Sequence, residues 1–288
     1  MYADGFPFNV LRVWTTSILS SLPETFFGPL AEESLDNASP GVNVAAFKPD
    51  KDKDNAVKIR YILFMVIIYI KLLCNGGEPS LAGLPAYDAS PMSGVDGRKI
   101  VAPLISTRWN QDAPYNLLVP SKDSRNYPTG CVATAMAQVM KYWNYPERGT
   151  GSGSITLPSG AQGESSMNFR TAFDWDNMLD IYKSGGYDDT QAEAVATLMK
   201  ACGYSTKMNY SMGGSGTLSR FAAQALVNNF SYNPDIEFCE RDYYSAAEWE
   251  GMLYAEMAAG RPVLYGGVSS SVGHEFVCDG YAGDGYFQ

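Results

Sequence analysis

Apolar residues recur at helical spacing at several places after residue 100. In the stretch Cys131–Trp143 the spacing is that of one helix face. That apolar stripe consists of Val132, Met136, Val139, Met140 and Trp143. The same periodicity predicts a helix over Asp189–Cys202 that stops at Gly203, and another over Leu218–Asn229. In the second of these, the apolar face is expected to hold Leu218, Phe221, Ala222, Ala225 and Leu226.

A fourth helix is predicted from its capping residues. Ser245 followed by Glu248 three positions later is a capping box, and Gly260 before Pro262 marks the end of the helix. After Pro262 the pattern changes to short strands separated by glycine-rich turns, in "PVLYGGV", "HEFVCDGY" and "DGYFQ". Helices followed by an antiparallel sheet indicate an α+β fold.

The first 96 residues are heterogeneous in composition. Residues 75–96 have the composition of a linker, and Lys58–Cys74 places two basic residues before ten uninterrupted apolar ones. A membrane span needs about 20 apolar residues, so this run is too short to be one. It is either a buried strand or helix of an N-terminal region of uncertain nature, or an export signal displaced from the chain start. The second interpretation predicts a secreted or envelope-associated protein.

The composition and charge of the chain limit the kinds of molecule that it is expected to bind. The chain has 288 residues, of which 45% are hydrophobic and 18% charged, as in an ordinary globular protein. A net charge of −10 argues against nucleic acid or an anionic membrane surface as the main partner.

The cysteines and the histidine decide the candidate chemistry. The five cysteines are scattered, odd in number and without a CxxC pair, which fits neither a disulfide framework nor a zinc site. The chain has one histidine, His274, so a multi-histidine metal site is excluded. Three cysteines fall in apolar helical or strand patterns and are predicted to be core residues: Cys202, Cys239 and Cys278.

Cys131 differs because Gly130 precedes it at the start of a predicted helix. A thiol reacts as its thiolate, and both a helix N-terminus and a neighbouring imidazolium lower the thiol pKa. His274 lies 143 residues further on, within the roughly 130–150 typical of papain-type enzymes, and opens a strand after Gly273. Two interpretations stay open at this point: Cys131 is a small buried hydrophobe, or it is a nucleophile partnered by His274.

Three blocks of sequence resemble the streptopain family of bacterial cysteine peptidases. They are "RWNQDAPYNLLVP" from Arg108, "TGCVATAMAQVMKYWNYP" from Thr129 and "GHEFVCDGY" from Gly273. The stretches "YSMGGSGTLSRFAAQAL" and "PVLYGGV" between them are similar more weakly. About two-thirds of the chain is covered, whereas residues 1–96 show no match to a prodomain.

The resemblance implies a papain-like fold and peptide-bond hydrolysis through a thioester. Cys131 falls on the family nucleophile and His274 on its general base and acid. Gln111 falls on the glutamine that forms the oxyanion hole with the Cys131 backbone N–H. Substrate contacts are expected from Gly130, Gly273 and the Gly213–Gly216 loop, which contains Ser215 and Gly216. The family usually takes a hydrophobic substrate residue close to the scissile bond, on its N-terminal side. Alternatively, Gln111 stabilises a turn and the loop is simply flexible.

One departure concerns the end of the chain. The family places an orienting asparagine and a tryptophan in an "NWGWGG" stretch after the histidine block, and this sequence stops at Gln288. We therefore expect a peptidase domain over residues 97–288 that lacks its last C-terminal strands.

The prediction as a whole is a cysteine endopeptidase that acts on proteins or peptides and needs no metal or organic cofactor. No prodomain or inhibitor is identifiable from the sequence. An inactive remnant that at most binds peptides is the alternative, and an acyl transferase using the same two residues is a further one.

Overall fold

The computed structural model describes residues 12–17, 97–268 and 273–288, with the backbone alone for residues 12–17. The chain divides into two compact units, of which the first comprises Met1–Ser21, Val101–Tyr281 and Phe287–Gln288, and the second Leu22–Ile100 and Ala282–Tyr286. The helices and the main sheet belong to the first unit. The predicted export segment Lys58–Cys74 and the predicted linker 75–96 lie outside the described residues.

The helices of the first unit follow the apolar periodicity. Their bounds are α3 Cys131–Trp143, α4 Asp189–Ser205, α5 Ser219–Phe230 and α6 Ala246–Ala258, with short 3₁₀ turns η3 Trp175–Asn177 and η4 Arg241–Tyr243. The prediction for α3 is confirmed at both ends. The predicted capping box of α6 is also confirmed, because the Glu248 backbone N–H donates to Ser245 and the Glu248 carboxylate accepts from the Ser245 N–H.

Two helix predictions were wrong in detail. Helix α4 continues through Gly203 to Ser205. Gly203 is therefore not a helix stop. A glycine is needed there because a Cβ would lie 2.2 Å from the Tyr210 hydroxyl oxygen. Leu218 is the N-cap of α5 and leaves 50% of its surface exposed, so it is not part of the buried face.

Four strands form the main sheet, in the order β6-β1-β7-β8. Their bounds are β1 Arg12–Ser17, β6 Glu237–Glu240, β7 Val263–Val268 and β8 Gly273–Cys278. The predicted antiparallel pairing of β7 with β8 is confirmed. The sheet as a whole is mixed, however, because β1 runs parallel to both β6 and β7. Its partners are more than 200 residues away in sequence, beyond the reach of a local pattern.

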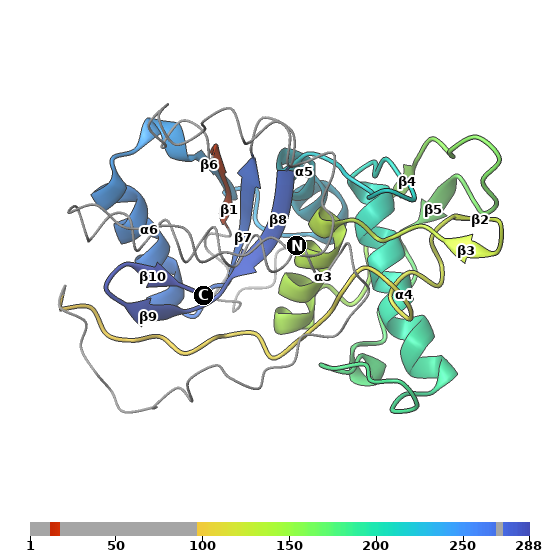
Figure 1. The fold of residues 1–288 in the computed structure, drawn as a ribbon, viewed down its shortest axis with the longest axis horizontal. Helices are drawn as coiled ribbons and strands as arrows, with labels where there is room; N and C mark the ends of the chain where they lie inside the picture. Colours follow the sequence, from red (N-terminus) through yellow and green to blue (C-terminus); the bar gives the residue numbers. More distant parts are fainter. Residues whose placement is uncertain (1–11, 18–96, 269–272) are drawn as a thin grey trace, which may run out of the picture. The chain divides into compact units, whose positions relative to one another are not determined.

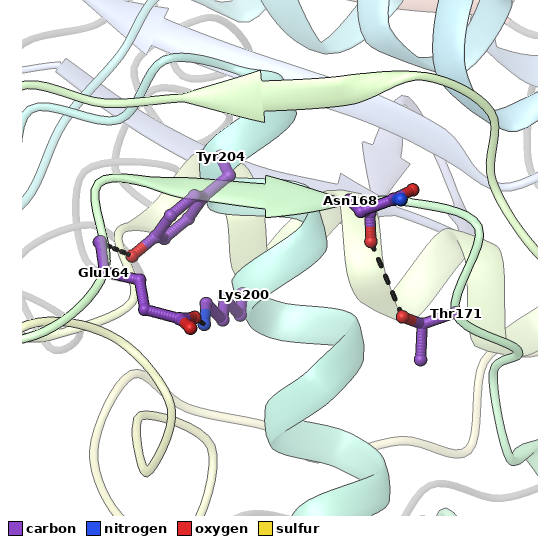
Figure 2. A network of polar contacts seen from close by, with 5 residues as sticks. All are labelled: Glu164, Asn168, Thr171, Lys200 and Tyr204. Carbon is purple, nitrogen blue, oxygen red and sulfur yellow. Dashed lines mark hydrogen bonds and ion pairs between the residues drawn. The ribbon is translucent and has the colours of Figure 1, made fainter.

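The remaining strands make small two-stranded sheets. The pairs are β2 Ser121–Lys122 with β3 Arg125–Asn126, β4 Ser152–Ser154 with β5 Ser166–Asn168, and β9 Tyr281–Gly283 with β10 Tyr286–Phe287. Figure 2 shows how α4 holds the segment around β5: the Tyr204 hydroxyl donates to the Glu164 backbone oxygen at 2.6 Å, and Lys200 pairs with the Glu164 carboxylate at 2.5 Å. Beyond β5, the Thr171 hydroxyl donates to the Asn168 backbone oxygen.

Two apolar clusters lie on opposite sides of β7 and β8. The larger contains residues of α3, α4 and α5 with Leu264 and Val277, and the smaller contains Trp249, Leu253 and Met257 of α6 with Val263 and Cys278. In Figure 1, α6 accordingly lies on one side of these strands and α3 on the other. Among the described residues, none of the helices has the length and apolar character needed to cross a membrane.

Candidate active site

The turn that leads into α3 is fixed by hydrogen bonds from within the helix. Both the backbone N–H and the hydroxyl of Thr134 donate to the Gly130 carbonyl oxygen, at 3.1 and 3.0 Å. The Thr134 hydroxyl also lies 2.8 Å from that of Thr129, and all three residues are buried. Cys131 is therefore held at the first position of the helix, where backbone N–H groups have no partner within the helix.

Gly130 is required at this turn for two reasons. Its φ of 89° is unfavourable for residues with a side chain. In addition, a Cβ at this position would lie 2.6 Å from the Met208 sulfur and 3.1 Å from the Ser215 carbonyl oxygen. The Gly213–Gly216 loop thus packs directly against the residue before Cys131.

The loop is itself held in a narrow hairpin. Asn209 and Gly216 exchange backbone hydrogen bonds at 3.0 and 3.1 Å, and the Ser215 hydroxyl accepts a hydrogen bond from the Ser211 N–H. Ser215 is buried and Gly216 is exposed. Of the predicted substrate-binding residues, the structure therefore brings Ser215 and Gly216 together with Gly130.

Gln111 reaches the same turn through its backbone. The Thr129 N–H donates to the Gln111 carbonyl oxygen at 3.1 Å, two residues before Cys131 in the chain. Just upstream, the Trp109 indole N–H donates to the Leu179 carbonyl oxygen at 2.9 Å and anchors the segment. Gln111 is 9% exposed, so its side chain is surrounded by protein.

Strand β8 passes the start of α3 and brings the histidine region to Cys131. Glu275, the residue after His274, lies close enough to Cys131 for its backbone and its carboxyl to influence the thiol pKa. Along β8, Val277 packs in the cluster that includes α3, whereas Cys278 packs in the cluster that includes α6. Strand alternation places Glu275 on the same face of β8 as Val277, toward α3. The His274 ring stacks near that of Phe276, at 6.3 Å between centroids.

The local electrostatics differ from the sequence-based expectation of a depressed thiol pKa. Burial raises the pKa of Cys131, and hydrogen bonds from the Glu275 and Val132 N–H groups lower it only in part. The nearby Glu275 carboxyl raises it further when charged. Burial also lowers the pKa of His274. These shifts favour a neutral thiol and a neutral imidazole over an ion pair.

Glu275 is the residue at this site that the sequence reasoning did not single out. Only 4% of it is exposed, and burial raises the pKa of its carboxyl to about 8. The Ser219 hydroxyl, at the start of α5, donates to Oε2 at 2.5 Å. Within the described part of the chain, Oε1 has no hydrogen-bond partner. The available signal was an acidic residue at an otherwise apolar strand position in "HEFVC".

The other predicted site residue and the other cysteines occupy separate environments. Gly273 is exposed at the first position of β8. Cys202, Cys239 and Cys278 are buried, which confirms their prediction as core residues. Burial raises the pKa of both Cys202 and Cys278, whereas Cys131 is partly exposed.

Comparison with known proteins assigns the family. Residues 109–288, which include Cys131, Gln111 and His274, match the peptidase C10 family. The chain belongs to this family. The match covers the helices α3 to α6 and the strands β7 and β8, so the C10 region coincides with the part of the structure that forms the candidate site.

The chain is also similar to individual curated proteins. The chain is 35% identical over 220 residues to the thiol protease/hemagglutinin PrtT of Porphyromonas gingivalis, and 35% identical over 195 residues to streptopain of Streptococcus pyogenes. These alignments cover 70% and 62% of the chain, but 24% of PrtT and 49% of streptopain. The chain thus spans about half or less of the length of these curated relatives.

Solved structures of interpain A from Prevotella intermedia show the same fold. The active wild-type cysteine protease is 38% identical with a TM-score of 0.61, over 70% of this chain and 84% of that one. A prointerpain A fragment is 34% identical with a TM-score of 0.61, over 83% of this chain and 73% of that one.

Proposed function

We propose that the chain is a cysteine endopeptidase of papain-like fold that acts on proteins or peptides. The observation that carries the proposal is the placement of Cys131 at the first position of α3, against the strand that bears His274, in a chain of the C10 family. No acidic residue occurs in the first turn of α3, so the helix dipole at Cys131 is unopposed within that turn.

The pKa shifts favour a reaction that starts from the neutral pair. His274 accepts the Cys131 proton as the sulfur attacks the carbonyl carbon of the scissile bond. The resulting oxyanion is held by the Cys131 backbone N–H and the Gln111 side-chain amide. His274 then donates the proton to the leaving amine, the C–N bond breaks, and a thioester remains. Water, deprotonated by His274, attacks the thioester; the acid product leaves and the thiol recovers its proton.

The test is alkylation of the purified chain with iodoacetamide between pH 5 and pH 9, each cysteine being followed by peptide mass spectrometry. We expect Cys131 to be labelled much faster than Cys202, Cys239 and Cys278. Because Cys131 is also more exposed than the other cysteines, exposure alone accounts for part of this difference in labelling rate. The decisive comparison is therefore between Cys131 labelling in wild type and in His274→Ala. Loss of the base should slow Cys131 labelling near neutral pH more than at pH 9, where more of the thiol is ionised without help from the base. Equal Cys131 profiles in the two proteins would refute the pairing.

We also propose that the protein is exported from the cell, to the medium or the cell envelope. The support is the basic and apolar pattern of Lys58–Cys74. Fractionation of a producing cell, with the Cys131 label as a marker, tests this; the labelled chain in the cytoplasm alone would refute it.

A further inference from the structure

The peptide unit that joins Gly130 to Cys131 carries both a buried carbonyl and a proposed oxyanion donor. The unit is trans and planar, so the direction of the Gly130 carbonyl fixes the direction of the Cys131 N–H. In the proposed reaction this N–H is one of the two groups that hold the oxyanion. Any group that fixes the Gly130 carbonyl therefore also aims the Cys131 N–H.

Thr134 holds this carbonyl with two hydrogen bonds. Its backbone N–H donates at 3.1 Å and its hydroxyl at 3.0 Å, and only 4% of the residue is exposed. A threonine hydroxyl often donates to the carbonyl four residues earlier in a helix. Here that carbonyl belongs to the same peptide unit as the Cys131 N–H. Two donors on the carbonyl polarise the unit, which makes the Cys131 N–H a stronger donor.

Thr129 supports the Thr134 hydroxyl from behind. The two hydroxyl oxygens lie 2.8 Å apart, and Thr129 is fully buried. The single hydroxyl proton of Thr134 is directed to the Gly130 carbonyl, so the Thr129 hydroxyl is the donor within this pair. The result is a chain of hydrogen bonds in one direction, from Thr129 through Thr134 to Gly130. Each bond in such a chain strengthens the next one.

The same pair of threonines also reaches the second proposed oxyanion donor. The Thr129 backbone N–H donates to the Gln111 carbonyl oxygen at 3.1 Å. The backbone of Gln111 and the Gly130–Cys131 peptide are thus both hydrogen-bonded to Thr129 and Thr134. Stabilisation of an oxyanion depends on donors that are already aimed before the reaction begins.

We propose that Thr134, supported by Thr129, is a positioning residue for the oxyanion hole. It does not touch the substrate and acts through the Gly130–Cys131 peptide. The inference rests on the proposed peptidase function and deepens it. It separates two reactions of the same sulfur: attack on a carbonyl creates an oxyanion, whereas alkylation by iodoacetamide displaces iodide and creates none. Loss of the Thr134 hydroxyl should therefore affect the first reaction and spare the second.

The test compares the full chain with Thr134→Val, which keeps the branched shape and the backbone N–H but removes the hydroxyl. With a fluorogenic peptide amide, kcat should fall by about tenfold or more, because the effect of losing an aimed donor lies in the oxyanion. KM and the rate of Cys131 alkylation should change by less than about twofold. Thr134→Ser, which restores a hydroxyl, should recover most of kcat.

A peptide aldehyde gives a second readout that does not require turnover. The Cys131 sulfur bonds to the aldehyde carbon, the thiol proton passes to His274 or to the aldehyde oxygen, and that oxygen then occupies the oxyanion position. Such an adduct resembles the transition state. Its affinity should therefore fall in Thr134→Val by a factor similar to the loss in kcat.

Thr206→Val is the matched control. Thr206 is also buried, and its hydroxyl donates to the Cys202 carbonyl oxygen four residues earlier, at 2.8 Å. This variant loses the same kind of hydrogen bond at the end of α4 and should retain kcat and aldehyde affinity.

Two results would overturn the inference. One is wild-type kcat and aldehyde affinity in Thr134→Val, and the other is a parallel loss of kcat and Cys131 alkylation, which would mean that Thr134 holds the nucleophile or the fold instead. A wild-type chain without turnover, aldehyde binding or Cys131 alkylation would refute the proposed function itself. If Thr134→Val fails to fold, Thr129→Val should lower kcat by a smaller factor and spare alkylation; unchanged kcat in that variant would equally overturn the inference.

Discussion

Replacement of Gly130 by alanine should destabilise the chain through two separate effects at the turn before Cys131. The φ of 89° is a conformation that costs a residue with a Cβ on the order of 1–3 kcal/mol. The added Cβ would also lie 2.6 Å from both the sulfur and the terminal carbon of Met208. Met208 is 1% exposed, so its side chain cannot move aside without disturbing the core, and overpacking of this kind costs about 1–3 kcal/mol.

Together the two effects predict a loss of about 2 to 6 kcal/mol in the free energy of unfolding. Urea unfolding followed by tryptophan fluorescence measures it. With an m-value of about 2 kcal/mol/M, the midpoint should fall by roughly 1 to 3 M. Gly216→Ala is the matched control in the adjoining loop, because no atom lies within 4 Å of its added Cβ. That variant should change the free energy by less than about 0.5 kcal/mol. Equal effects of the two substitutions would refute the reasoning about this turn.

Three further predictions concern Glu275, Gln111 and Gly203. Burial raises the pKa of Glu275 from an ordinary 4.5 to about 8 in the folded chain. Between these two pH values the folded state keeps a proton that the unfolded state releases. The free energy of unfolding therefore falls as the pH rises from about 4.5 to 8. The free energy of unfolding of Glu275→Gln, relative to wild type, should therefore increase by up to about 5 kcal/mol across that pH range. Urea unfolding at pH 5 and pH 8 measures it, and the same difference between the two proteins at both pH values would contradict the burial of this carboxyl. Gln111→Ala should lower kcat by about 10²–10³ with little change in KM or in Cys131 alkylation, whereas a pure turn role predicts lost stability and unchanged kcat. Gly203→Ala should lower the Tm, against the usual gain of about 1 kcal/mol for this change inside a helix, because its Cβ would lie 2.2 Å from the Tyr210 hydroxyl; a raised Tm would contradict that contact.

Features fixed by neighbouring residues could be predicted from the sequence. The apolar stripe and Gly130 gave the bounds of α3, and Ser245 with Glu248 gave the start of α6. The strand character of β7 and β8 followed from alternation and flanking glycines.

Features that depend on residues far apart in the sequence could not be predicted from it. Gly203 resembles a helix stop until Tyr210 is placed against it. The parallel pairing of β1 with β6 and β7 depends on partners more than 200 residues away. The burial of Glu275 beside Cys131 arises because β8 crosses the start of α3. Burial of the thiol itself reverses the expected direction of its pKa shift.

The most direct test of the central claim is detection of the thioester. The chain is mixed with a peptide p-nitrophenyl ester, quenched in acid within milliseconds to seconds, and digested for peptide mass spectrometry. We predict that the acyl group is found on the peptide that contains Cys131, and that Cys131→Ala forms no acyl-enzyme and does not cleave peptide amides, whereas Cys202→Ala retains both activities. Cleavage that persists in Cys131→Ala, or acylation confined to another residue, would contradict the assignment of Cys131 as the nucleophile.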